Sequence, residues 1–150
     1  HVADDMHARF SAKSRTYRYY IHTRKTPFSR HYSLETHYRL DFDIMNLAAS
    51  HLLETHDFAA FCKAGSDVKT TICHVFRASW VEQSRGEWYF EITADRFLRN
   101  MVRAVVGTLV DVGRGRLSLE EFKAIIESRR RSNARESMPP QALFLEDITY

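Results

Sequence analysis

The 150-residue sequence contains only two cysteines, five glycines and three prolines, and it has no long hydrophobic run. Cys62 and Cys73 are too few and too far apart for a zinc motif or a disulfide scaffold, so we interpret them as reduced, partly buried thiols of a cytoplasmic protein. No apolar stretch approaches the roughly 18 residues that a membrane-spanning helix needs. These absences argue against a metal centre, a disulfide-stabilised secreted domain and a membrane protein.

Motifs that carry catalysis by themselves are also missing. The sequence has no serine nucleophile elbow and no phosphate-binding P-loop, and VGRGR at 112–116 is too short and badly placed for a dinucleotide fingerprint. His51 and His56 are five residues apart, whereas a spacing of about four places two ligands on one helical face. We therefore expect a structural or surface role for these histidines, and neither a metal nor a small-molecule cofactor.

Basic residues are gathered in groups along the chain. The sequence has 22 Lys and Arg against 19 Asp and Glu, and its pI is about 9.0. The groups outside the central segment are Arg9, Lys13, Arg15 and Arg18, then Arg129, Arg130 and Arg131. Arginine matches phosphate geometry through its planar fork, which favours a nucleic-acid partner over a membrane surface. For any single group, an ordinary solvated face is an equally good interpretation.

The apolar patterning predicts a mixed architecture in one domain over 1–150. Expected strands are 14–23, 72–83, 87–94 and 142–150, with a turn at 84–86 between the middle two. Alternation along the first strand places Tyr17 and Ile21 on one face and Arg18 and Tyr20 on the other. We therefore predict an α+β fold: a largely antiparallel mixed sheet with helices packed on one face.

Three helices are expected. One covers 42–54 and opens with Asp43 as its N-cap, and another follows a capping box formed by Ser118 and Glu121. The third begins at Arg96, is capped by Asp95 and ends just before Gly113.

In that third helix Arg96, Arg99 and Arg103 would fall at i, i+3 and i+7 and form a stripe on one face. Cations in the first turns oppose the helix dipole by a few tenths of a kcal/mol each. Such a stripe therefore indicates an anionic partner. Tyr17 lies between Arg15 and Arg18, an interleaving that suits RNA, although a core tyrosine beside snorkelling arginines fits the spacing as well.

Four segments resemble the C-terminal portion of the TruA-type tRNA pseudouridine synthases in order and spacing. They are MHARFSAKSRTYRYYI (6–21), HDFAAFCKAGSDVKTTI (56–72), ADRFLRNMVRAVVGTLVDVGRG (94–115) and PPQALFLEDITY (139–150). The resemblance implies a pseudouridine synthase-like half-domain. It also implies a homodimeric enzyme that isomerises uridine to pseudouridine in the anticodon stem-loop of tRNA without cofactor or metal.

The resemblance also implies roles for individual residues. In that family an aspartate of an RTDAG-type motif attacks the nucleoside, a tyrosine of the YRY segment lies against the flipped base, and an arginine of the FLxxMVR helix pairs with the aspartate. Here the tyrosine is Tyr17 and the arginine is Arg103. We expect Arg103 to lie one turn deeper in its helix than the other two arginines, where the aspartate would balance its charge. Phe58 and Phe61 match the family's DFxxF corner and are expected to pack.

No RTDAG motif occurs in these 150 residues. The sequence also begins with His1 and shows no signal peptide, so we expect a piece of a longer chain that is inactive in isolation. Predicted RNA contacts are Arg9, Lys13, Arg15, Arg18, Lys69, Arg96 and Arg99. Cys73, Arg135 and Ala142 depart from the residues usual in the family. A non-catalytic RNA-binding module and a structural or dimerisation domain remain as alternative functions.

Overall fold

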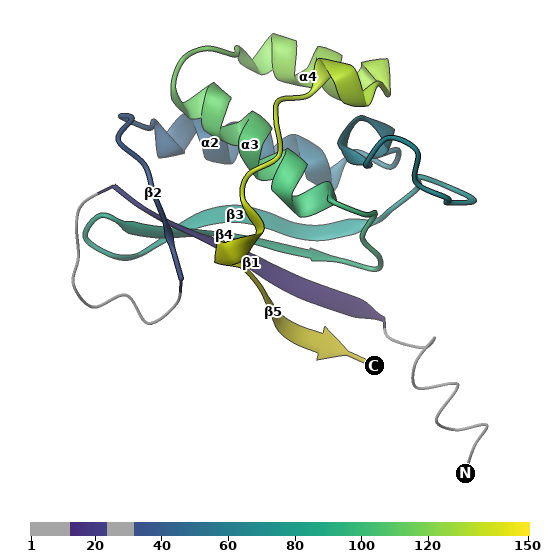
Figure 1. The fold of residues 1–150 in the computed structure, drawn as a ribbon, viewed down its shortest axis with the longest axis horizontal. Coiled ribbons are helices and arrows are strands. Elements are labelled where there is room, and N and C mark those ends of the chain that lie inside the picture. Colours follow the sequence, from purple (N-terminus) through teal and green to yellow (C-terminus); the bar gives the residue numbers. More distant parts are fainter. Residues whose placement is uncertain (1–12, 24–31) are drawn as a thin grey trace.

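The computed structural model describes residues 13–23 and 32–150. Within them three α-helices lie together on one face of a five-stranded sheet (Figure 1). They are α2 (Phe42–Ser50), α3 (Met101–Gly113) and α4 (Leu119–Ser128). This arrangement confirms the predicted α+β class. Arg9 lies outside the described residues.

The sheet is built around β1, and its strands are β1 (Ser14–His22), β2 (Leu34–Glu35), β3 (Val75–Ser84), β4 (Glu87–Ala94) and β5 (Leu143–Thr149). β1 pairs antiparallel with β4 and β5, and parallel with the short β2. β3 and β4 form the expected hairpin, whose turn contains Gly86 with φ of 79°. The predicted strands are thus confirmed to within a few residues.

Short 3₁₀ segments connect these elements. They are η1 (His51–Leu53), η2 (Ala59–Phe61), η3 (Arg131–Asn133) and η4 (Pro140–Ala142). The expected helix at 42–54 therefore ends as an α-helix at Ser50 and continues as η1.

The core fills the space between the sheet and the helices. Tyr19, Phe90 and Ile92 of the sheet are fully buried there. Phe58 and Phe61 are also fully buried, which confirms their packing role. Cys62 and Cys73 are buried, free thiols, as predicted. Burial raises the pKa of Cys73 to about 11, so this thiol is protonated at neutral pH.

The N-terminus of α4 is capped as predicted, whereas that of α2 is capped by a different residue. Ser118 and Glu121 form the predicted capping box at α4. At α2 the expected N-cap was wrong by two residues: the Asp41 carboxylate, not that of Asp43, accepts from the first backbone N–H groups. Asp43 instead lies in the first turn, where an acidic side chain complements the helix dipole.

The predicted start of the arginine helix was wrong. α3 begins at Met101, after a turn in which Asn100 has φ of 69°, and the preceding segment is a loop. The Asp95 carboxylate does not cap α3, because it accepts from the backbone N–H of His74 at 2.8 Å. Arg96 and Arg99 therefore precede the helix and form no stripe with Arg103. The spacing of apolar residues does not distinguish this loop from a helix, because Leu98 in the loop is buried as an apolar residue of a helix would be.

The end of α3 also differs by one residue from the prediction. Gly113 is the last helical residue, and the left-handed conformation falls at Gly115, with φ of 80°. A Cβ on Gly113 would lie 2.3 Å from the sulfur of Met45. Gly113 therefore permits the close contact between α2 and α3.

None of the described helices combines the length and the apolar character that crossing a membrane requires.

Candidate active site

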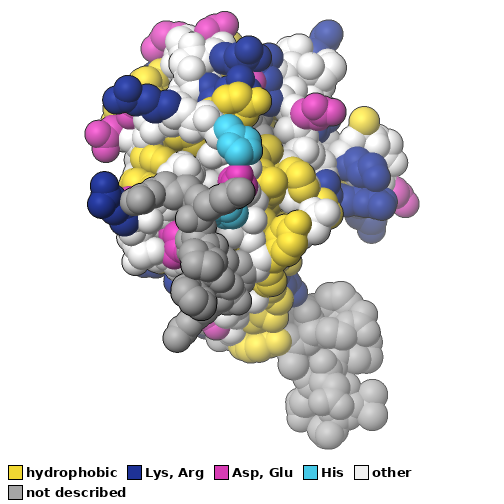
Figure 2. Space-filling model, turned by 60° about the vertical axis from the view of Figure 1, so that its left-hand side comes forward, with side chains coloured by type: hydrophobic (Ala, Val, Ile, Leu, Met, Phe, Trp, Pro, Cys, Tyr) yellow, Lys and Arg dark blue, Asp and Glu magenta, His cyan; other side chains and the backbone are white. Residues whose placement is uncertain are grey.

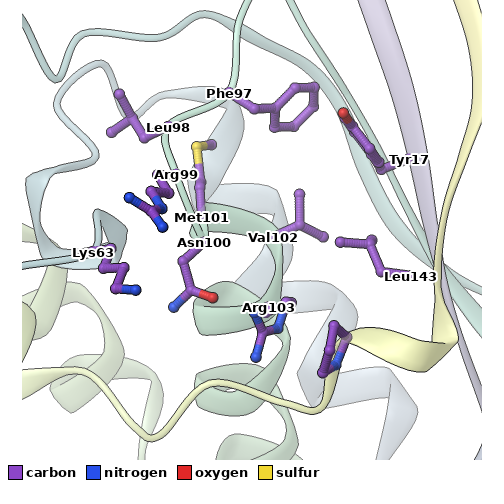
Figure 3. A pocket seen from close by; sticks show the side chains of 11 residues that line it. Tyr17, Lys63, Phe97, Leu98, Arg99, Asn100, Met101, Val102, Arg103 and Leu143 are labelled. Carbon is purple, nitrogen blue, oxygen red and sulfur yellow. The ribbon is translucent and has the colours of Figure 1, made fainter. Parts of the chain in front are cut away.

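A pocket of about 650 Å³ opens where α3 begins. It lies between β1, the loop that precedes α3, and η4 (Figure 3). Its lining residues are Tyr17, Lys63, Phe97, Leu98, Arg99, Asn100, Met101, Val102, Arg103, Pro140 and Leu143. Tyr17 and Arg103, the two residues predicted to be catalytic, therefore line one cavity although they come from different elements.

The pocket has one cationic side and one apolar side. Figure 3 shows Lys63, Arg99 and Arg103 on one side, and Tyr17 with Phe97 on the other. None of the described residues that line it is acidic. Such a cavity suits a ligand that combines an anionic group with a flat ring.

Tyr17 is positioned by its strand and by an aromatic neighbour. β1 places it opposite Ile92 of β4 and Leu145 of β5, next to a register shift in the pairing with β5. Its half-buried ring meets that of Phe97 edge-on, with centroids 4.9 Å apart and planes at 84°. The next side chain on the same strand face, Tyr19, is fully buried and directed into the core.

Arg103 lies in the first turn of α3. The prediction that it lies one turn deeper in the helix is therefore wrong. Its side chain is half-buried, and its Nε donates to the carbonyl of Met138 at 2.7 Å. Within the described residues no carboxylate pairs with it. The guanidinium therefore has Nη donors left for a ligand or another segment.

Lys63 and Arg99 share the cationic side of the pocket. Both side chains are exposed, and the backbone N–H of Lys63 donates to the carbonyl of Arg99 at 3.0 Å, so the two positions are held side by side. Sequence reasoning predicted Arg99 but missed Lys63. The available signal was a basic residue directly after the aromatic corner that contains Phe58 and Phe61.

Five other predicted RNA contacts that the structure describes lie outside the pocket. Arg96 donates through Nη1 to the carbonyls of Thr70 and Ile72, at 3.0 and 3.2 Å, and so braces the loop that carries Lys69. Lys69 is exposed on that loop. Lys13 is exposed just before β1, and Arg15 is half-buried on β1.

Arg18 points to the sheet face opposite the pocket. Its Nε contacts Glu91 at 2.9 Å, and its guanidinium lies 4.2 Å from the ring centroid of Tyr89. Arg77 contacts the other carboxylate oxygen of Glu91 at 3.0 Å. Burial raises the pKa of the Glu91 carboxyl, but the two arginines outweigh burial and lower it below its usual value. Arg18 is thus engaged in an ion-pair network on this face.

The described histidines form no metal cluster. Among the described residues no group of three or more histidine, cysteine or acidic side chains is arranged to hold a metal ion. His56 instead packs edge-on against His74, with ring centroids 6.1 Å apart.

Comparison with known proteins identifies the class of protein. Residues 48–150 match the family model described as tRNA pseudouridine synthase. The chain therefore belongs to the tRNA pseudouridine synthase family.

Individual relatives extend the match to almost the whole chain. It is 52% identical over 149 residues to tRNA pseudouridine synthase A of Bacteroides fragilis, and 51% identical over 150 residues to that of Porphyromonas gingivalis. The Bacillus subtilis protein of the same name is 41% identical over 152 residues. Each alignment includes 99% of this chain but only 59% to 61% of the relative. The chain thus spans about three-fifths of the length of these relatives.

Proposed function

We propose that this chain forms the C-terminal domain of an enzyme that isomerises uridine to pseudouridine in the anticodon stem-loop of tRNA. The observation that carries this proposal is the shared pocket of Tyr17 and Arg103, with cations on one side and, in the part of the chain that the structure describes, no acidic residue in its lining. The names of the relatives supply the substrate class, tRNA.

The pocket is suited to receive a carboxylate from outside this chain. Arg103 lines it, and none of the lining residues that the structure describes is acidic. A nearby guanidinium favours the ionised form of a carboxyl group, which is the form that a nucleophile requires. We assign this carboxylate to the aspartate of an RTDAG-type motif, which these 150 residues lack. Alone, the chain should be inactive.

Tyr17 would contact the base of the target uridine. Flipping a base out of its stack costs a few kcal/mol, and stacking on an aromatic ring in the pocket offsets part of that cost. In the reaction the bond from the sugar to N1 breaks, the base re-attaches through C5, and the C5 proton leaves. The Tyr17 hydroxyl is a candidate acceptor for that proton, either directly or through water. Stacking and proton removal are therefore two separable roles for this residue.

The remaining cations would bind the RNA backbone. Lys63 and Arg99 are exposed cations of the pocket lining, where the phosphates that flank a flipped nucleotide would pass. Figure 2 shows lysine and arginine side chains at several places on one face, including a group on the lobe at the right. We propose that Lys13, Arg15, Lys69 and Arg96 extend this contact, that the enzyme acts as a homodimer, and that it works in the cytoplasm, where its tRNA substrate is found.

A non-catalytic RNA-binding module is the second candidate function. It is favoured by one observation: residues 13–23 and 32–150 contribute no acidic residue to the lining of the pocket. This candidate predicts salt-dependent tRNA binding without turnover, even when the chain is part of a longer protein.

Release of tritium from tRNA labelled at C5 of uridine separates the two functions. The test uses the full-length protein that contains this chain, with Arg103→Ala and Tyr17→Phe as variants and Arg116→Ala, an exposed arginine outside the pocket, as the matched control. We expect both variants to lose turnover and to keep much of the tRNA affinity, while the control is unchanged. Near-normal turnover in both variants would show that the assigned roles are wrong.

A further inference from the structure

Residues 135–140, here called the strap, cross α3 on their way to β5 (Figure 1). The crossing is close, since a Cβ on Gly107 would lie 2.1 Å from the carbonyl oxygen of Glu136. At the end of the crossing the strap bonds twice to the same helical residue. The backbone N–H of Met138 donates to the carbonyl of Arg103 at 3.1 Å, and the Nε of Arg103 donates to the carbonyl of Met138 at 2.7 Å.

A single hydroxyl holds the strap next to this double contact. The Oγ of Ser137 accepts from the side-chain amide of Asn100 and from Nη2 of Arg131, the latter at 2.9 Å. Nη1 of Arg131 donates to the carbonyl of Arg135 at 3.1 Å, so Arg131 grips the strap at two points. Ser137 thereby joins the residue that precedes α3 to a residue of η3.

Buried side chains hold the strap near both of its ends. The phenol of Tyr19, whose ring is fully buried, donates to the carbonyl of Pro139 at 2.7 Å. The backbone N–H of Arg135 donates to the hydroxyl of Thr108 at 3.2 Å. The carbonyl of Met138 is therefore fixed between two anchored neighbours.

We infer that the strap is a positioning element that orients Arg103 in the pocket, with Ser137 and Arg131 as its positioning residues. A guanidinium is planar, so a bond from Nε to a fixed carbonyl sets the plane of the whole group. With Nε occupied, the two Nη nitrogens form the edge that remains for end-on, bidentate contact with a carboxylate. Neither Ser137 nor Arg131 lines the pocket. Arg131 acts on the pocket through the strap and Arg103, and Ser137 acts through the strap and through Asn100, a lining residue.

This inference rests on the proposed function, because it assumes that Arg103 meets the catalytic carboxylate. Displacement of a reacting group by about 1 Å can cost on the order of 100-fold in rate. Removal of the Ser137 hydroxyl frees the strap and also releases the side-chain amide of Asn100, while the side chains of Arg103 and Tyr17 are unchanged. The rate of the chemical step should therefore fall while the RNA contacts persist.

The test measures single-turnover tritium release at saturating tRNA in the full-length protein that contains this chain. We expect Ser137→Ala to lower the rate about 10-fold and to leave tRNA affinity within twofold. Ser137→Thr keeps the hydroxyl and should restore most of the rate. Arg131→Lys should resemble Ser137→Ala, because an ammonium cannot make both contacts, whereas the matched control Arg130→Lys, at an exposed neighbouring position, should behave as the parent.

A second measurement does not depend on activity. The ¹⁵Nε NMR signal of Arg103, assigned by its loss in Arg103→Lys, should show slow hydrogen exchange in the parent and fast exchange in Ser137→Ala and Arg131→Lys. Parental single-turnover rates in both variants would overturn the inference and leave the proposed function intact. If the parent releases no tritium from any tRNA, the proposed function fails, and the NMR signal still decides whether the strap holds Arg103. Should Ser137→Ala fail to fold, Arg131→Lys carries both readouts.

Discussion

The ring of Phe97 meets the ring of Tyr17 edge-on, with centroids 4.9 Å apart. Phe97 belongs to the loop that replaces the expected first turns of the arginine helix. Because of this loop, an aromatic side chain lies beside Tyr17 in the pocket, and the start of α3 faces the same space. The contact leads to a first prediction.

Phe97→Ala should impair catalysis more than stability. An aromatic pair contributes about 0.5 to 1.5 kcal/mol beyond burial, and its loss leaves the Tyr17 ring free to rotate. We expect the rate of single-turnover tritium release in the full-length protein to fall about 10-fold, because a misplaced reacting group slows the chemical step. Phe97→Tyr keeps the ring and serves as the control. A parental rate in Phe97→Ala would show that this contact does not position Tyr17.

Lys63→Ala and Arg99→Ala should weaken tRNA binding in a salt-dependent way. Each contact with a phosphate contributes about 0.7 to 0.9 to the slope of log affinity against log salt concentration. We expect each variant to reduce the slope by about that amount and to keep the rate at saturating tRNA. Filter binding over a series of salt concentrations measures the slope. Lys123→Ala, a lysine of α4 that contacts Glu120, is the matched control, and a slope equal to the parent's in both variants would exclude a phosphate contact.

Gly107→Ala should destabilise the fold. The added Cβ would lie 2.1 Å from a backbone oxygen of the strap, and backbone cannot move aside cheaply. Overpacking of this kind costs about 1 to 3 kcal/mol, which urea denaturation measures. Gly65→Ala is the control, because an added Cβ at Gly65 would have no atom within 4 Å, although φ is 77° there. It measures the cost of the left-handed backbone alone, about 1 kcal/mol. If Gly107→Ala is no less stable than the parent, the strap does not press on α3.

Glu91→Gln should destabilise the protein in a pH-dependent way. The pKa of Glu91 is lower in the folded state than its usual value, because Arg18 and Arg77 together outweigh burial. Its stabilising contribution is therefore fully present above the unfolded-state pKa and is lost as pH falls through the folded-state pKa. We expect a deficit of about 1 to 3 kcal/mol at pH 7, which shrinks below about pH 4.5.

The measurement for Glu91 is urea denaturation at several pH values. Glu127→Gln, at an exposed position on α4, is the control and should match the parent throughout. A deficit that stays constant from pH 7 to pH 3 would mean that the network contributes through packing rather than through charge.

Local patterns in the sequence determined most of the secondary structure. The alternation along β1 and the hairpin of β3 and β4 were predictable because a strand places successive side chains on opposite faces. The capping box at α4 was predictable because its two residues satisfy each other's backbone groups over a spacing of three. The resemblance carried by motifs likewise pointed to Tyr17 and Arg103, which line one pocket.

Tertiary structure decided what those patterns left out. Residues 96–100 have apolar spacing that fits a helix, but burial of Leu98 and the left-handed Asn100 make them a loop, so Arg96 and Arg99 leave the predicted stripe. The position of Lys63 beside Arg99 and the grip of the strap on Arg103 are long-range contacts between segments that share no local signal. A side chain's neighbours along the chain fix its face on a strand or helix, whereas its partners across the fold depend on how those elements pack.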